Sequence, residues 1–251
     1  MENPRQRNFL DNMQEQIPLQ TFKAKLSEKQ VINEKFTTYH FELVEPNKME
    51  FLSGQYVSFA VSDTGERRSY SISSSPDVTH SFEVTIDVKP NGIGIQFFEN
   101  LVFGDEVSLM GPMGQFFIQE EPREDEIALI ATGSGVAPMR SMIIDLLKNK
   151  GDKRKITLYW GLRHEEDMIW QDEFQDYAQT FENFNFHPTL SQAKQEWPLC
   201  RGRVTDCLDI HELPTNAGFY LCGSSQMIQD VKGILIKKGV SEAAIHHEKF
   251  Y

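Results

Sequence analysis

Hydrophobic positions follow different periods in the two halves of the chain. Between residues 38 and 110, apolar and polar residues alternate in short runs separated by glycine, proline and polar clusters, which is typical of half-buried strands. Many short strands with frequent turns favour an antiparallel barrel or sandwich. The predicted strands are Thr38 to Val44, Gln55 to Ser62, Arg68 to Ser73, Ser81 to Val88 and Glu106 to Met110, with one helix around Ile95 to Leu101.

After a charged, proline-containing stretch at residues 120–126, continuous apolar runs alternate with segments of helical spacing. This alternation predicts a mostly parallel sheet covered by helices. The predicted strands are Ile127 to Ala131, Ile156 to Trp160, Phe184 to Leu190 and Gly218 to Cys222, and the predicted helices are Pro138 to Lys148, Asp167 to Ala178 and Gln226 to Lys237.

These patterns predict two domains, which suits a chain of 251 residues. We expect an antiparallel β-barrel domain over residues 19–122, an α/β parallel-sheet domain over residues 123–251, and an N-terminal arm or tail over residues 1–18. No apolar stretch is long enough to cross a bilayer, and the first eight residues are too polar for a secretory signal. We therefore expect no transmembrane segment and a cytoplasmic location.

Charge and cysteine usage narrow the classes of function. A net charge of -12 makes nonspecific binding to nucleic acid unfavourable, because that surface is negative as well. The cysteines have neither the number nor the spacing of a disulfide framework, a zinc site or a four-cysteine iron–sulfur cluster, and the histidines are scattered. We therefore predict no metal site, and the sequence does not indicate an oligomeric state. The residues considered are Cys200, Cys207, Cys222, His164, His187, His211, His246 and His247.

Three segments carry candidate chemistry, and the first begins at Arg68 on a predicted strand. Residues two apart on a strand share a face, so Arg68 and Tyr70 point the same way. A guanidinium can pair with a pyrophosphate, a phenol ring can lie against an aromatic cofactor, and Ser71 could reach the polar edge of that ring. The alternative is a polar edge strand with a stacked tyrosine.

The second segment, Thr132-Gly133-Ser134-Gly135-Val136-Ala137-Pro138, follows an apolar strand and opens a helix. Its glycines let the backbone approach a phosphate, and the N–H groups at the helix start supply donors. The third glycine of the usual dinucleotide fingerprint is missing, and a tight turn without a ligand is the alternative.

The third segment is Leu221-Cys222-Gly223-Ser224-Ser225-Gln226-Met227, another apolar strand that runs into a helix. The carboxyl edge of the sheet would place Cys222 beside the Gly133 turn. The alternative for Cys222 is a small apolar filler of the core. The chain ends on His246 to Tyr251, where two terminal aromatic residues could pin the last strand.

Together these segments resemble the ferredoxin-NADP reductase superfamily, in its motif order, from about Thr21 to the last residue. The resemblance implies bound FAD, with FMN less favoured, and NADH or NADPH as the substrate. It also implies that Glu248-x-Phe250 is the carboxyl-terminal Glu-x-aromatic motif, whose ring shields the flavin. The implied catalytic residues are Ser71, Cys222, Glu248 and Phe250. The implied cofactor-binding residues are Arg68, Ser69, Tyr70, Ser71, Ser74, Gly92, Gly94, Ile95, Thr132, Gly133, Gly135, Pro138, Arg163, Cys222, Gly223, Met227, Phe250 and Tyr251.

Two positions depart from the pattern of the superfamily. Ile95 stands where relatives carry the serine of a Gly-x-x-Ser phosphate motif, so one hydroxyl contact to FAD is lost. Gln192 stands where NADP-dependent relatives often carry arginine, and Arg163 is followed by acidic residues. The balance favours NADH, although Arg163, Arg201 and Arg203 could reverse this preference.

The resemblance implies hydride transfer from the nicotinamide C4 to the flavin N5, with Phe250 or Tyr251 moving aside and Cys222 bordering the path. The sequence contains no cluster-binding cysteine segment, so the electrons must leave for a separate acceptor. Candidates are a ferredoxin, a flavodoxin, an oxygenase component or a small molecule. The alternative function is a noncatalytic flavin- or nucleotide-binding subunit, or a redox-sensing module of a larger complex.

Overall fold

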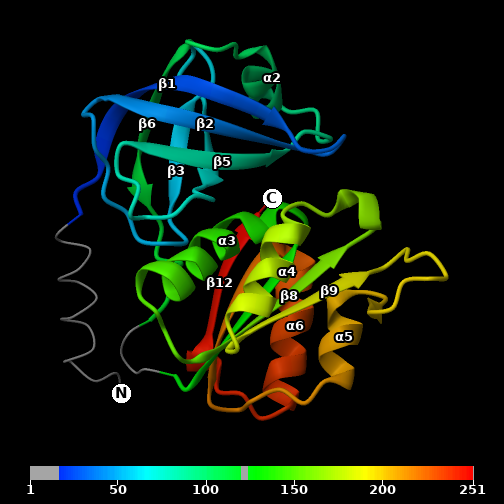
Figure 1. Cartoon of the computed structure of the whole chain (residues 1–251). Helices are drawn as coiled ribbons and strands as arrows, with labels where there is room; N and C mark the ends of the chain where they lie inside the picture. The colour runs from blue at the N-terminus through cyan, green and yellow to red at the C-terminus, as the bar shows by residue number, and fades with distance from the viewer. Residues whose placement is uncertain (1–16, 120–123, 251) are drawn as a thin grey trace.

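Two six-stranded sheets, one antiparallel and one parallel, form the two domains of the molecule (Figure 1). The computed structural model describes residues 17–119 and 124–250. The predicted order, an antiparallel barrel followed by an α/β domain, is confirmed. The predicted domain boundary at residues 122 and 123 and most of the predicted arm lie outside the described residues.

The barrel sheet has the strand order β4-β3-β6-β1-β2-β5, and its neighbouring strands are antiparallel. It nearly closes, because Ile72, directly after β4, forms an isolated antiparallel bridge to Val84 on β5. The α2 helix (Ile93–Asn100) covers one end and inserts Phe98, whose ring lies 5.0 Å from that of Phe59. The strands are β1 (Gln20–Val31), β2 (Phe36–Glu45), β3 (Tyr56–Ala60), β4 (Arg67–Ser71), β5 (Ser81–Asp87) and β6 (Glu106–Met113).

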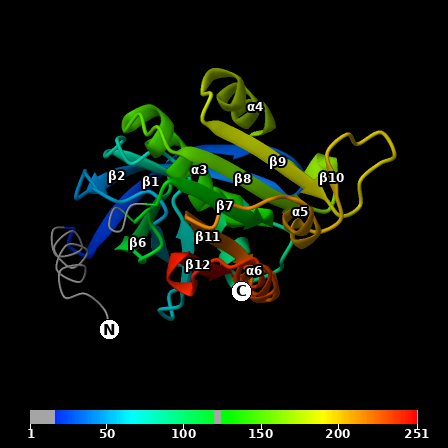
Figure 2. The same ribbon diagram turned by 90° about the horizontal axis from the view of Figure 1, so that it is seen from below.

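The second sheet has the order β10-β9-β8-β7-β11-β12, and its neighbouring strands are parallel. Side chains alternate between its faces: Leu129 packs in the cluster with α3 and α4, whereas Ile130 packs in the cluster with α5 and α6. Figure 2 shows the sheet between these two helix layers. The strands are β7 (Glu126–Thr132), β8 (Lys155–Leu162), β9 (Phe184–Leu190), β10 (Cys200–Arg201), β11 (Ala217–Ser224) and β12 (Ile245–Phe250).

The helices of this domain start and end differently from the sequence prediction at two places. The α3 helix begins after a 3-10 turn at Gly133–Gly135 and continues into a π-helical turn, Asp145–Asn149. The α4 helix begins at Gln171, because Trp170 before it takes a left-handed conformation with φ of 54°. The helices are α3 (Val136–Ile144), α4 (Gln171–Thr180), α5 (Val204–Ile210) and α6 (Ser225–Lys237). No helix in the described part of the chain is long and apolar enough to cross a membrane.

Strand order places a crevice at one edge of the parallel sheet. From β7 the chain adds β8 and β9 on one side, whereas β11 and β12 lie on the other. Connections from neighbouring strands diverge at such a switch point, so ligands of open α/β sheets bind outside the carboxyl ends of the strands there. The Gly133–Gly135 turn follows β7 at this edge, and Ser224 ends β11 beside it.

Arg140 on α3 joins the two domains. Its guanidinium donates to the Ser73 carbonyl oxygen at 3.0 Å and to a Glu83 carboxylate oxygen at 2.9 Å, both in the barrel. It also donates to Glu173 on α4 at 2.8 Å. Because one side chain serves both domains and two helices, it fixes α3 against the barrel.

Candidate functional site

A cavity of about 200 Å³ lies between the barrel and the start of α3. A Cβ built on Gly94 would lie 2.3 Å from Tyr70 Oη and 3.0 Å from Arg68 Cγ, so both side chains lie over this glycine, as the strand period predicted. Burial raises the pKa of Tyr70 to about 12, and its phenol is therefore neutral. The cavity is lined by Arg68, Ser69, Tyr70, Ser71, Thr85, Ile86, Asp87, Pro90, Ile95, Ser134, Ala137 and Phe250.

The start of α2 supplies an anion-binding end beside this cavity. Gly92 caps the helix without a side-chain hydrogen bond, and the first turn contains no acidic residue. Its backbone N–H groups therefore keep donor capacity and positive potential for a phosphate. A neutral phenol ring, a guanidinium and a helix start on one cavity fit the aromatic ring and the pyrophosphate of FAD.

The last strand brings Glu248 and Phe250 to the same place. Phe250 lines the cavity with Tyr70, and the Ser71 hydroxyl donates to Glu248 Oε2 at 3.3 Å. Burial raises the pKa of the Glu248 carboxyl to about 7, although the bond from Ser71 acts in the opposite direction. Glu248 can therefore hold or release a proton near neutral pH. Tyr251 lies outside the described residues.

Cys222 lies at the end of β11, directly against the turn that follows β7. A Cβ on Gly135 would lie 2.2 Å from the Cys222 carbonyl oxygen, which explains the need for glycine there. The thiol is fully buried, and burial, with a smaller contribution from Glu248, raises its pKa well above the ordinary value. Cys222 thus lies beside the Gly133–Gly135 turn, as the sequence predicted. The catalytic role of its neutral thiol stays a prediction.

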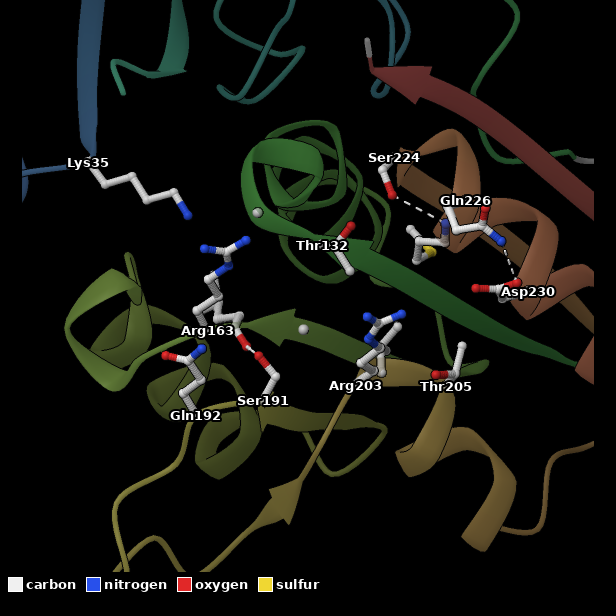
Figure 3. Close-up of a pocket in the computed structure, with 15 residues that line it drawn as sticks. Lys35, Thr132, Arg163, Ser191, Gln192, Arg203, Thr205, Ser224, Gln226 and Asp230 are labelled. Carbon is white, nitrogen blue, oxygen red and sulfur yellow. Dashed lines mark hydrogen bonds between the residues drawn. The ribbon is translucent and has the colours of Figure 1, made fainter. Parts of the chain in front are cut away.

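A second, larger cavity of about 750 Å³ lies at the carboxyl edge of the parallel sheet (Figure 3). Gly133 opens onto it with φ of 55°, and a Cβ there would meet nothing within 4 Å. The Ser224 hydroxyl accepts from the Met227 N–H at 3.2 Å and so caps α6 at the cavity wall. The lining residues are Lys35, Thr132, Gly133, Gly161, Leu162, Arg163, Ser191, Gln192, Arg203, Val204, Thr205, Ser224, Gln226, Met227 and Asp230.

Three cationic side chains reach this cavity from different elements. Figure 3 shows Lys35 descending from the barrel towards Arg163, while Arg203 comes from the start of α5. Lys35 is partly neutralised, because its Nζ lies 3.7 Å from Asp167 and 3.8 Å from Asp87. The size and the cationic lining fit a dinucleotide with its phosphates.

The two cavities share a wall. Gly133 lines the larger cavity, and its chain neighbour Ser134 lines the smaller one with Ala137. A planar group entering from the larger cavity would therefore come next to a ring held in the smaller one.

Some predicted site residues lie away from the cavity linings. The Ser74 hydroxyl accepts from the Glu83 N–H at 3.1 Å and ties the loop after β4 to β5. Pro138 is buried in α3, and Gly223 packs against Thr132. Arg201 donates to the Trp197 carbonyl oxygen at 2.9 Å and is used within its own loop.

Other lining residues were not among the predicted site residues. Ser224 had a local signal, since serine before a helical pattern is a typical N-cap. Lys35 had none, because only folding brings a barrel hairpin to the nucleotide cavity. The missed residues include Lys35, Thr85, Pro90, Thr205, Ser224, Gln226 and Asp230.

A barrel cavity suited to a flavin, which adjoins a nucleotide cavity on a parallel sheet, defines a two-domain flavin- and nucleotide-binding oxidoreductase. Residues 23–118 match the oxidoreductase FAD-binding domain family, and residues 129–233 match the oxidoreductase NAD-binding domain family. Together with this fold, these matches show that the chain belongs to the ferredoxin-NADP reductase superfamily.

Similar proteins carry the names of an electron transfer component and of reductases. The chain is 29% identical over 224 residues to the anthranilate 1,2-dioxygenase electron transfer component of Acinetobacter baylyi, covering 88% of this chain and 64% of the relative. It is 35% identical over 217 residues to the phenol 2-monooxygenase reductase component DmpP of a Pseudomonas species, covering 84% and 60%. It thus spans less than two thirds of the length of these two relatives. The crystal structure of the Amycolatopsis cytochrome P450 reductase GcoB superposes with a TM-score of 0.84 at 28% identity, covering 93% of this chain and 71% of that one.

Proposed function

We propose that this chain is a flavoprotein reductase that uses bound FAD to take a hydride from NADH or NADPH and passes the electrons to a separate acceptor. The observation that carries the proposal is the shared wall, where Gly133 and Ser134 line different cavities. The names of the two relatives, one a dioxygenase component and one a monooxygenase component, support an oxygenase component as the acceptor. A ferredoxin, a flavodoxin or a small molecule are the other candidates.

FAD, when bound, supplies the chemistry of accepting a hydride and releasing electrons singly. Arg68 and the N–H groups at the start of α2 would hold its phosphates. Tyr70 and Phe250 line the same cavity and would exclude water from the ring. Phe250 lines this cavity together with Ser134 of the shared wall, so Phe250 or the following Tyr251 would turn aside when a nicotinamide enters.

Ser71 and Glu248 would hold and pass on a proton, whereas Cys222 would shape the wall of the site. The Ser71 hydroxyl is within hydrogen-bond reach of Glu248, so a proton on that carboxyl can be passed on at the edge of the cavity. Cys222, as a buried neutral thiol, would form part of the wall and would not attack a substrate.

The cavity favours NADH over NADPH in this proposal. Gln192 is neutral where a 2′-phosphate would need a cation, and the charge of Lys35 is already partly used by Asp167. Asp230 adds a negative side chain to the lining. Because NADH and NADPH are made and used inside cells, the proposal includes a cytoplasmic location.

Visible spectroscopy of the purified protein before and after anaerobic NADH, and separately NADPH, tests the proposal. Flavin bands should bleach with NADH at about tenfold lower concentration than with NADPH. Arg68→Ala should weaken FAD binding by roughly 10- to 100-fold, as expected for a lost charge-assisted pair. The matched control is Arg67→Ala, whose guanidinium is bonded to Ser58 within the barrel. A protein that takes up no flavin would leave the noncatalytic module as the better explanation.

A further inference from the structure

Three side chains with metal-binding atoms meet on the α5 and α6 side of the parallel sheet. The sulfur of Cys200 lies 2.7 Å from that of Cys207 and 3.4 Å from His211 Nε2. The three ligand atoms all lie within 4.8 Å of one another. None of these residues lines the flavin or the nucleotide cavity, so the proposed reductase chemistry leaves them without a role.

The local fold explains why they converge. Cys207 lies in α5, and His211 directly follows the last residue of this helix. Because His211 comes four residues after Cys207, both side chains project from the same side. Cys200 lies in β10, from which a turn leads directly into α5. Along the sequence the cysteines and histidines look unrelated, and the strand-turn-helix unit is what joins two of the cysteines to one histidine.

The surroundings suit a bound cation. Cys207 is fully buried, and Cys200 and His211 are half-buried among apolar neighbours such as Val204 and Leu208. Such surroundings strengthen the attraction between a cation and thiolates.

Neighbouring side chains support both ends of the cluster. The buried Thr189 hydroxyl lies against the Cys207 sulfur, where it could donate a hydrogen bond to a metal-bound thiolate. His187 stacks on Tyr159, with 5.2 Å between ring centroids, and its ring lies 5.3 Å from that of His211. The imidazole of His211 thus packs, at a tilt of 49°, against the stacked pair of Tyr159 and His187.

We propose that Cys200, Cys207 and His211 bind one zinc ion through two thiolates and one imidazole, with water in the fourth position. Sulfur and nitrogen donors in this combination are the ligands that Zn²⁺ prefers. Binding releases one proton from each thiol to solvent and transfers no electron. Zinc–sulfur bonds of about 2.3 Å require the sulfurs to move apart to roughly 3.7 Å, which the half-buried Cys200 side chain allows.

Zinc at this position would also act on the nucleotide cavity. Cys200 and Cys207 bracket a short segment that carries Arg203 and Thr205, which line the cavity. Fixing both ends of this segment reduces the entropy that nucleotide binding must remove. This coupling rests on the proposed function, whereas the zinc site itself does not.

The test uses the full chain with its flavin, reduced by a phosphine, stripped with a chelator and titrated with zinc chloride against a chromophoric competitor. We expect one zinc per chain, confirmed by elemental analysis. Cys200→Ser and His211→Ala should each weaken zinc binding by at least ~10-fold. The control His80→Gln, on an exposed barrel loop, should bind zinc like the wild type. Cobalt substitution should give thiolate-type absorption beyond the flavin bands.

Zinc binding that is unchanged in Cys200→Ser, or that never reaches one ion per chain, would overturn the site. So would a Cys200–Cys207 disulfide in the isolated protein whose reduction yields no zinc binding. If one zinc binds and the KM for NADH is the same with and without it, the coupling is wrong and the site stands. Since zinc content is measured without turnover, failure of the reductase proposal would be distinguishable from failure of the site.

Discussion

The Ser71 hydroxyl donates a 3.3 Å hydrogen bond to the Glu248 carboxylate across the boundary between the two domains. The two residues stand 177 positions apart, Ser71 at the end of β4 and Glu248 on the last strand. Because Ser71 also lines the barrel cavity, the bond connects a titratable carboxyl of one domain to the ligand cavity of the other. The protonation of Glu248 is therefore linked both to the cavity and to the stability of the domain contact.

Glu248 should make the protein less stable as the pH rises from about 4.5 to about 7. Its pKa is raised from 4.5 to about 7 in the folded state. The unfolded chain therefore loses this proton at lower pH than the folded chain does, and the free energy of unfolding falls over that range. The effect is at most about 3 kcal/mol. In Glu248→Gln this part of the pH dependence should vanish, as measured by urea unfolding at several pH values.

The control for this prediction is Glu242→Gln, which changes an exposed acid near the same strand. Its unfolding free energy should follow the wild type at every pH. Parallel pH profiles for wild type and Glu248→Gln would show that this carboxyl titrates normally.

Gly94→Ala should weaken FAD binding through a steric effect. The new methyl group would lie 2.3 Å from Tyr70 Oη, so the ring and the neighbouring Arg68 must shift in the cavity. We expect about 10-fold weaker binding or more, corresponding to at least ~1.4 kcal/mol. Flavin fluorescence on titration measures this. Gly233→Ala is the control, because a Cβ there meets nothing within 4 Å, and equal affinities in both variants would contradict the close approach at Gly94.

Gln192→Arg should shift the nucleotide preference towards NADPH. The new guanidinium would face the cavity where a 2′-phosphate needs a partner, and a charge-assisted pair there is worth about 1.5–3 kcal/mol. The ratio of kcat/KM for NADPH over NADH should rise roughly tenfold or more. Gln195→Arg adds the same charge in the same loop outside the lining residues and should leave the ratio unchanged. An equal rise in both variants would point to general electrostatic attraction instead.

Arg140→Met should destabilise the folded chain by about 2 kcal/mol, because the half-buried Glu83 and Glu173 lose their shared cation. Adding Glu83→Gln and Glu173→Gln should recover part of this loss. Urea unfolding measures each variant. Lys23→Ala breaks an exposed ion pair to Glu45 and should change stability by less than ~1 kcal/mol. A similar small effect for Arg140→Met would mean that the bridge contributes little.

Sequence periodicity was most reliable where local pattern and burial agree. The strand at Phe184–Leu190 has the predicted bounds, because its first and last residues are buried and apolar and polar residues flank it on both sides. The β1 strand was missed although Phe22, Ala24 and Leu26 alternate inward, since lysines and other polar residues dominate its composition. The late start of α4 depends on tertiary contacts of Trp170, whose ring lies 4.7 Å from the Arg140 guanidinium.

In the candidate site, too, residues in local motifs could be predicted, whereas residues brought in by tertiary contacts could not. Arg68, Tyr70 and Gly133 stand in motifs whose spacing fixes their direction, and all three line the cavities. Contacts that cross from one domain to the other leave no local pattern, which is why Lys35 was not predicted. The meeting of Cys200 with His211 likewise depends on the path of one turn and not on a spacing typical of known sites.

The position of Lys35 gives a bound nucleotide a second effect. This side chain belongs to the barrel, yet it lines a cavity made mainly by the other domain, so a ligand there would touch both. By mass action, whatever binds only the assembled form favours assembly. If the chain were cut between the two domains and the two fragments were mixed, NADH should lower the dissociation constant of the fragment complex. The nucleotide would then control the assembly of a split protein.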